Sequence, residues 1–197
     1  MDENRGQGVK VLFLGNPNSP LVEYLMGVGE KVIVTWDKID PQTIETQKPD
    51  FLVSYGYRHI LRENVLGLLS DRAVNLHIAF LPWNRGADPN FWSFAEHTPK
   101  GVTIHYLDKG VDTGDIIAQR CVMPFPHDTF KTSYYRLQYE MQRLFKENWP
   151  DIRVGKCSRS KQGRPCTFHY SKDKNRLMHM LIDGWDTPVS VFDGYEE

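Results

Sequence analysis

The chain has 197 residues, with 24 Lys and Arg against 25 Asp and Glu, and 40% of its residues are hydrophobic. This length suits one well-buried α/β core with a short appendage and is short for two full domains. Because the formal net charge is -1, the chain lacks the basic field that drives binding to phosphate backbones. This balance disfavours a nucleic-acid partner.

Two further classes of protein are disfavoured by the sequence. No apolar run reaches the roughly 20 residues needed to span a bilayer, and the N-terminus lacks the apolar stretch of a signal peptide. We therefore expect a soluble, cytoplasmic protein. The three cysteines, Cys121, Cys157 and Cys166, are odd in number and lack the close paired spacing of a zinc site. We expect reduced thiols and no bound metal.

The first part of the sequence alternates short apolar runs with helical segments. Four runs are expected to form strands, at residues 9–14, 31–36, 51–55 and 73–77. Ser19 can cap a helix that begins at Pro20, and a second short helix is expected within 61–69. This alternation predicts an α/β fold with a doubly wound, mostly parallel sheet.

The loop after the first predicted strand contains Gly15 but neither a G-x-G-x-x-G pattern nor a Walker lysine. We therefore interpret it as an ordinary turn between a strand and a helix. Further along, Asp88 and Pro89 can start another helix, and a pair of strands is expected at 102–106 and 116–120.

The longest predicted helix begins at Asp128 or Thr129 and carries apolar residues at every third or fourth position until Pro150 ends the pattern. We accordingly divide the chain into a catalytic core, 1–150, and a C-terminal extension, 151–197, that packs on the core. Within the extension, the basic segment 153–164 is interpreted as a solvated surface loop, although such a loop can also attract a phosphate.

Asn75 and His77 stand two residues apart at the end of a predicted strand, so both side chains lie on one face. An imidazole ordinarily titrates near neutral pH, which makes His77 the predicted general base and acid. Asp112, in a glycine-flanked loop, would orient that imidazole and stabilise its cation. Asn75 would donate an N–H to an oxyanion. Since neither segment holds a nucleophilic Ser or Cys, we expect direct attack of a substrate amine on an acyl donor through a tetrahedral intermediate.

The order of these motifs resembles the 10-formyltetrahydrofolate-dependent formyltransferase family. The resemblance rests on Asn75-Leu-His77, then Leu81-Pro-Trp-Asn-Arg-Gly86, and later Val111-Asp-Thr-Gly114. It implies a Rossmann-like core, 10-formyltetrahydrofolate as formyl donor, and Asn75, His77 and Asp112 as the catalytic set. It also implies a pterin pocket lined by Tyr57, His59, Leu61, Leu81 and Asp108.

The formyl acceptor is less constrained by sequence. Asn84-Arg-Gly86 and the tail at 167–190 are similar to bacterial formyltransferases that act on nucleotide-linked amino sugars, which implies a pathway of the pseudaminic-acid type. In that interpretation Arg85 and His105 would position the nucleotide sugar.

Other members of the family are weaker matches. The chain lacks the glycine- and serine-rich phosphate loop of glycinamide-ribonucleotide formyltransferases after its first strand, and the residues after Pro150 are too few for the additional domain of methionyl-tRNA formyltransferases. Another small amine as acceptor, hydrolysis of the donor, and a non-catalytic binding module stay open as alternatives. Apolar residues near the end, including Met178 and Trp185, are expected to form either a core edge or a homodimer contact.

Overall fold

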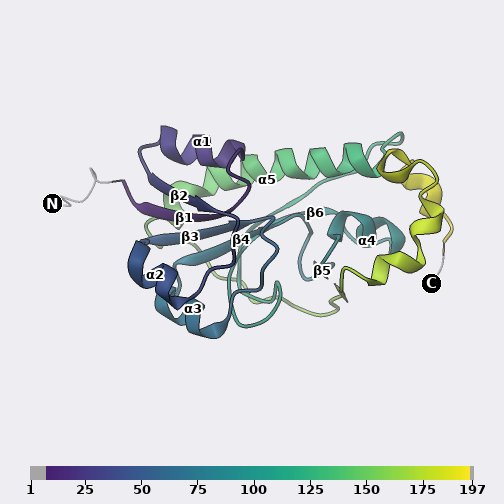
Figure 1. The fold of residues 1–197 in the computed structure, drawn as a ribbon. Helices are drawn as coiled ribbons and strands as arrows, with labels where there is room; N and C mark the ends of the chain where they lie inside the picture. Colours follow the sequence, from purple (N-terminus) through teal and green to yellow (C-terminus); the bar gives the residue numbers. More distant parts are fainter. Residues whose placement is uncertain (1–7, 196–197) are drawn as a thin grey trace.

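The computed structural model describes residues 8–195, and its centre is a six-stranded sheet in the order β2-β1-β3-β4-β6-β7 (Figure 1). The strands are β1 (Lys10–Gly15), β2 (Lys31–Thr35), β3 (Phe51–Tyr55), β4 (Ala73–His77), β6 (Gly101–Tyr106) and β7 (Ile116–Cys121). The first four strands in chain order run parallel, whereas β6 is antiparallel to β4 and β7 is antiparallel to β6. The prediction of a mostly parallel α/β sheet is confirmed.

Helices cover both faces of this sheet. Figure 1 shows α1 (Pro20–Gly27) and α5 (Phe130–Ile152) on one face, with α2 (Pro41–Gln47) and α3 (Glu63–Leu69) on the other. Strand β1 serves both layers, because Val11 and Phe13 join the cluster under α1 and α5 while Leu12 and Leu14 join the cluster under α2 and α3. A strand that is buried on both faces has a continuous apolar sequence. This is why the apolar run at residues 9–14 predicted β1.

The helix starts follow local capping rules. Pro20 occupies the first turn of α1, and the Ser19 hydroxyl accepts a hydrogen bond from the Leu21 N–H, as the sequence predicted. Helix α2 was not predicted. It begins after Asp40, which forms a reciprocal capping box with Thr43.

The prediction that Pro150 ends the longest helix is wrong, because α5 continues through Pro150 to Ile152. A proline inside a helix leaves the carbonyl four residues earlier without its usual donor. Here the Tyr24 hydroxyl donates to that carbonyl, on Lys146, at 3.1 Å. Trp149 and Ile152 are buried in the core, and their packing holds the last turn in place.

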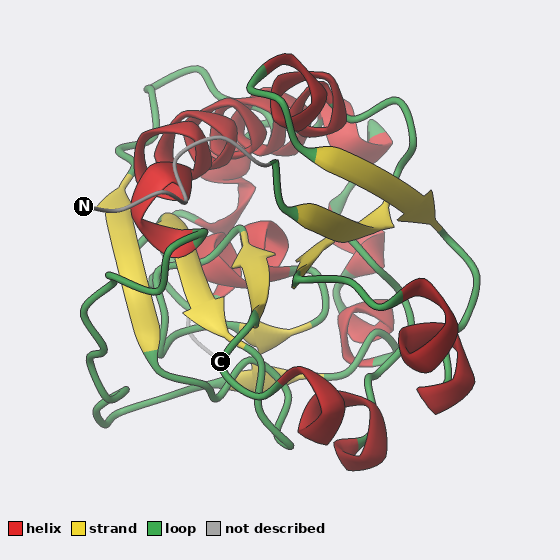
Figure 2. Ribbon diagram, turned by 90° about the vertical axis from the view of Figure 1, so that its left-hand side faces the viewer, coloured by secondary structure: helices red, strands yellow, loops and turns green. Residues whose placement is uncertain are grey.

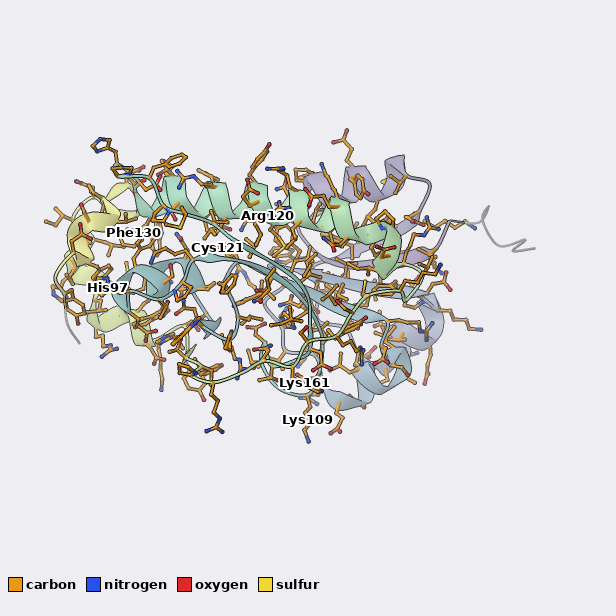
Figure 3. All side chains as sticks on the ribbon, turned by 180° about the vertical axis from the view of Figure 1, so that it is seen from behind. His97, Lys109, Arg120, Cys121, Phe130 and Lys161 are labelled. Carbon is orange, nitrogen blue, oxygen red and sulfur yellow. The ribbon has the colours of Figure 1, made fainter. Side chains whose placement is uncertain are left out.

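After α5 the chain returns along the sheet and forms a short strand, β8 (Phe168–His169), that pairs in parallel with β5 (Arg85–Gly86). Four short 3-10 turns follow, η1 (Asp173–Arg176), η2 (Met178–Met180), η3 (Gly184–Asp186) and η4 (Val189–Phe192), visible as the small helical pieces of Figure 2. Their apolar residues form a third cluster with α4 (Pro89–Ala95) and Phe130. Figure 3 shows Phe130 at this end of the molecule, beside the yellow C-terminal segment. The boundary at 150 stays a prediction, and helix α5 crosses it.

Candidate active site

Asn75 and His77 lie at the carboxyl end of β4, at the junction between the parallel and antiparallel parts of the sheet. Asn75 is opposite His105 of β6, and His77 is opposite Thr103. Because residues two apart in a strand share a face, the two polar side chains project to the same side. Ligands of open α/β sheets commonly bind at carboxyl ends of strands where the strand order changes.

Asp112 reaches these residues from the loop between β6 and β7. Its backbone adopts a left-handed conformation with φ of 53°, which aspartate tolerates better than most side chains do. Two residues later, Gly114 packs so closely that an added Cβ would lie 1.8 Å from the Tyr106 carbonyl oxygen. Only glycine fits at that point, so the loop is held against β6 and the Asp112 carboxylate is directed to the end of β4.

Four groups surround the Asp112 carboxylate. Oδ1 accepts a hydrogen bond from Asn75 Nδ2 at 3.0 Å and lies 3.3 Å from His105 Nε2. Oδ2 accepts from the Gly86 backbone N–H at 2.9 Å and lies 3.6 Å from His77 Nδ1. The structure therefore brings Asn75, His77 and Asp112 together, and it adds His105 and Gly86 to the group.

These partners determine the charge of Asp112. Burial alone would raise the pKa of this carboxyl, but the adjacent His77, the contact with His105 and the Gly86 N–H outweigh burial and hold the pKa well below its usual range. Asp112 is consequently ionised at any physiological pH. An ionised carboxylate beside an imidazole stabilises the imidazolium form.

The His77 ring is fixed by a backbone carbonyl. Nε2 lies 2.9 Å from the carbonyl oxygen of Asn84, which can only accept, so Nε2 carries a hydrogen. In the neutral ring Nδ1 is then unprotonated and faces Asp112. Asn84 is itself fully buried, in a left-handed conformation, and its side chain donates to Thr98 Oγ1 at 2.7 Å. This role could not be predicted from the sequence, because a backbone carbonyl acts through its position and not through its residue type.

His105 is almost completely buried, at 1% exposed. Its predicted contact with a nucleotide sugar stays a prediction, because the structure shows this ring only against groups of the protein. Its Nδ1 donates to the Tyr106 carbonyl oxygen at 2.8 Å, and its Nε2 lies 3.3 Å from both Asn75 Nδ2 and Asp112 Oδ1. Both nitrogens are therefore engaged inside the protein, beneath the Asn75 amide.

Arg85 is in direct contact with the basic segment 153–164, and its predicted role toward the substrate stays a prediction. Arg85 donates to Gln162 Oε1 through Nε at 3.0 Å and through Nη2 at 2.7 Å. Gln162 Nε2 in turn donates to the carbonyl oxygens of Asp112 and Gly114, at 2.9 and 2.7 Å. The segment is thus not simply solvated, because one of its residues connects Arg85 to the Asp112 loop.

The residues expected at the pterin pocket fall into two groups. Tyr57 and Leu61, after β3, pack on the same apolar cluster as Leu107 of the Asp112 loop, so the two loops adjoin. The Tyr57 and His59 rings make an edge contact at 5.2 Å.

Leu81 and Asp108, by contrast, are used by the protein itself. Leu81 is 1% exposed. Asp108 Oδ1 accepts from the Gly110 N–H at 3.0 Å and from the Thr113 hydroxyl at 2.6 Å, so it shapes its own loop. Leu81 therefore has almost no surface left for a ligand, whereas Asp108 is exposed and its place in the donor pocket stays a prediction.

Residues 8–195 contain no group of three or more His, Cys, Asp or Glu side chains arranged to hold a metal ion. No helix among them combines the length and the apolar character needed to cross a membrane.

Comparison with known proteins identifies the family. The formyl transferase family model matches residues 37–148, more than half of the chain, from just after β2 to the last turns of α5. The chain belongs to the formyl transferase family. The matched region contains Asn75, His77 and Asp112, together with Gly86 and His105.

Curated relatives agree with this membership. The methionyl-tRNA formyltransferase of Methylacidiphilum infernorum is 35% identical over 143 residues, which cover 72% of this chain and 44% of the relative. That of Caldanaerobacter subterraneus subsp. tengcongensis is 31% identical over 166 residues, which cover 82% of this chain and 52% of the relative. This formyl transferase chain therefore spans about half the length of these curated relatives.

A solved structure is similar over its whole length. The formyltransferase PseJ from Anoxybacillus kamchatkensis is 45% identical with a TM-score of 0.91, and the match covers 95% of this chain and 100% of PseJ. That crystal structure is a complex with UDP-4,6-dideoxy-4-formamido-L-AltNAc and tetrahydrofolate.

Proposed function

We propose that this protein transfers the formyl group of 10-formyltetrahydrofolate to the primary amine of a nucleotide-linked amino sugar. The observation that carries the chemistry is the convergence of Asn75, His77 and Asp112 at the end of β4 around one ionised carboxylate. The sugar substrate is supported by the 45% identity with PseJ, whose crystal structure holds a formylated UDP-sugar and tetrahydrofolate.

Each of the three residues has a role that its position permits. When bound, 10-formyltetrahydrofolate supplies an activated formyl carbon. His77 Nδ1 takes the proton that the attacking amine loses and returns it to the departing nitrogen, and the adjacent Asp112 stabilises the imidazolium between those two steps. The second N–H of Asn75, which makes only a long contact of 3.3 Å with His105 Nε2, is the one that would donate to the negative charge that develops on the formyl oxygen.

The loops that we assign to the folate donor suit an aromatic, partly apolar group. Tyr57, His59 and Leu61 are incompletely buried and stand beside the Asp112 loop, which places them next to the proposed reaction centre. The Tyr57 hydroxyl donates to the Asp37 carbonyl oxygen at 2.6 Å, and this bond fixes the ring. We assign Tyr57, His59 and Leu61 to the donor pocket, with Asp108 as a further predicted contact, and leave Leu81 to the loop framework.

Acceptor-dependent turnover tests this proposal. Purified protein would be incubated with 10-formyltetrahydrofolate and a panel of UDP- and dTDP-linked amino sugars, together with methionyl-tRNA and glycinamide ribonucleotide. We expect tetrahydrofolate release that depends on a nucleotide sugar, with the formylated sugar detected by mass spectrometry. His77→Asn should abolish release. His97→Asn, at an exposed histidine labelled in Figure 3, should leave turnover within a factor of two.

Other outcomes would replace the proposal with a specific alternative. Release without any acceptor would identify a hydrolase, and release that depends only on methionyl-tRNA or glycinamide ribonucleotide would identify a different formyl acceptor. Folate binding without turnover of any acceptor would identify a non-catalytic module.

A further inference from the structure

The loop after β4 presents two backbone groups to the candidate site. His77 Nε2 lies 2.9 Å from the carbonyl oxygen of Asn84, and the Gly86 N–H donates to Asp112 Oδ2 at 2.9 Å. Because both groups belong to the main chain, their directions depend on the backbone conformation of the loop. The contacts that hold this loop therefore determine the surroundings of His77 and Asp112.

Thr167, the residue directly before β8, holds the Asn84 backbone. Its hydroxyl oxygen accepts a hydrogen bond from the Asn84 backbone N–H at 2.8 Å, and the hydroxyl itself donates to Asn84 Oδ1 at 3.3 Å. The Thr167 carbonyl oxygen accepts from the next N–H of the loop, on Arg85, at 3.1 Å. The other end of the Asn84 side chain, Nδ2, donates to Thr98 Oγ1 at 2.7 Å. One residue of the C-terminal extension thus contacts both the main chain and the side chain of Asn84.

Asn84 needs this support because of its conformation. Its φ is 56°, in the left-handed region that residues other than glycine seldom adopt, and the residue is fully buried. Such a conformation persists only where the surrounding contacts impose it. A change to an extended or right-handed conformation would rotate the peptide group that carries the Asn84 carbonyl oxygen, and the contact with His77 Nε2 would be lost.

The loss of that contact would change the tautomer of His77. The neutral imidazole has one N–H, and the Asn84 carbonyl oxygen holds it at Nε2. The ionised Asp112, 3.6 Å from Nδ1, favours the opposite tautomer, in which Nδ1 carries the hydrogen. In that tautomer Nδ1 has no free electron pair to take the proton of an attacking amine.

We propose that Thr167 is a positioning residue for formyl transfer and acts on His77 through the Asn84 carbonyl. The Thr167 hydroxyl keeps Asn84 in its left-handed conformation, and the Asn84 carbonyl oxygen keeps the hydrogen of the neutral His77 ring on Nε2. Nδ1 then stays free to accept a proton. The inference rests on the proposed function for the reaction that it affects, but the tautomer of His77 can be measured without that reaction.

Nitrogen NMR of the ligand-free protein, prepared with isotopically labelled histidine, measures the tautomer directly. The spectra are recorded at alkaline pH, where imidazoles are neutral, and the His77 signals are identified by their absence in His77→Gln. We expect the wild-type ring to carry its hydrogen on Nε2. Thr167→Val keeps the shape of threonine without its hydroxyl and should populate the Nδ1–H tautomer. Thr167→Ser keeps the hydroxyl and should give the wild-type spectrum.

Steady-state kinetics with the accepted nucleotide sugar separate a positioning role from a general loss of structure. Thr167→Val should lower kcat by roughly tenfold or more while the KM of both substrates stays within twofold, and Thr167→Ser should stay within threefold of wild type. Thr43→Val is the matched control, because the Thr43 hydroxyl also bonds to a main-chain N–H and a side chain, both of Asp40 before α2. It should leave kcat and the His77 tautomer unchanged.

Each further outcome decides between the two proposals. If Thr167→Val is misfolded by circular dichroism, Thr98→Val repeats both measurements, because it removes the hydroxyl that holds the other end of the Asn84 side chain. The inference is wrong if the tautomer is unchanged in the folded variant, or if the tautomer changes while kcat stays within threefold of wild type. A changed tautomer in a protein whose wild type formylates no nucleotide sugar would support the hold of Thr167 on the His77 ring and refute the proposed function.

Discussion

Replacing Asp112 with Asn tests the candidate site most directly, because the two side chains have the same shape. Each carboxylate oxygen of Asp112 faces a donor: Oδ1 faces Asn75 Nδ2 at 3.0 Å, and Oδ2 faces the Gly86 N–H at 2.9 Å. An amide has one oxygen and one NH₂ group. In either orientation Asp112→Asn therefore places an N–H against another N–H.

The expected loss of stability in Asp112→Asn follows from that geometry. A hydrogen bond to a charged group contributes roughly 1.5–3 kcal/mol, and Asp112→Asn loses at least one while leaving a buried donor unpaired. Removing a buried charge offsets part of this loss, so we expect the free energy of unfolding to fall by about 2 kcal/mol. Formyl transfer should fall further, by roughly 10²- to 10⁴-fold in kcat, because the variant has no charge to stabilise the His77 imidazolium.

The difference in unfolding free energy between wild type and Asp112→Asn should also depend on pH. The pKa of Asp112 is lower in the folded protein than in the unfolded chain, where an aspartate titrates at about 3.9. Its contribution to stability is therefore complete above the unfolded pKa and is lost as the pH falls toward the folded pKa. The gap in unfolding free energy between wild type and Asp112→Asn should be constant from about pH 8 to about pH 5 and narrow below about pH 4.

Urea unfolding at several pH values, combined with turnover measurements, checks these expectations. Asp108→Asn is the matched control for stability, because both of its donors, from Gly110 and Thr113, reach the same oxygen, Oδ1. One amide oxygen can accept from both. If Asp112→Asn unfolds at the same urea concentration as wild type and turns over within threefold of it, the assignment of a central charged role to Asp112 is wrong.

Three further variants examine the surroundings of the carboxylate. His77→Gln should lower kcat by roughly 10²- to 10⁴-fold while folate binding, followed by fluorescence, stays within twofold; unchanged turnover would exclude His77 as the proton carrier. His105→Phe should lower kcat about tenfold without changing KM, because His105 Nε2 lies 3.3 Å from the Asn75 amide nitrogen and helps to hold it in place; a KM effect alone would contradict this positioning role. Gln162→Leu should lower the free energy of unfolding by about 2 kcal/mol in thermal unfolding, because it removes the bonds to the Asp112 loop. The control is Lys161→Ala, at a neighbouring side chain that is 88% exposed, and it should lower the free energy of unfolding by less than about 0.5 kcal/mol. Equal effects would argue against the link from Gln162 to the Asp112 loop.

Much of the fold was predictable because its central strands, such as β1 and β3, are buried on both faces. Runs such as Val11–Leu14 and Phe51–Val53 are apolar throughout, and tight caps such as Ser19–Pro20 mark where helices begin. The prediction at Pro150 was wrong for a reason that lies far away in the sequence. Tyr24 supplies the donor that proline lacks, and no local pattern could have indicated that contact.

The candidate site was predictable to a similar extent. Asn75 and His77 share a strand end, and a glycine-flanked Asp112 is a recognisable loop residue. The partners that set their properties were not predictable, because the Asn84 carbonyl and the Gly86 N–H are backbone groups. Gln162 was missed for another reason: it lies 50 residues from Asp112 in a segment whose composition indicates only a solvated loop.

The C-terminal extension is consequently part of the candidate site and not only a cover for the core. Gly86, whose N–H holds Asp112, is paired with His169 of β8, and an added Cβ at Gly86 would lie 2.3 Å from the His169 carbonyl oxygen. Gln162 holds the same Asp112 loop from the other side, through the carbonyl oxygens of Asp112 and Gly114. Two segments that follow α5 therefore fix the position of one carboxylate. A shift of the extension would move this charged group, so the geometry of the reaction centre depends on how the C-terminal extension packs on the core.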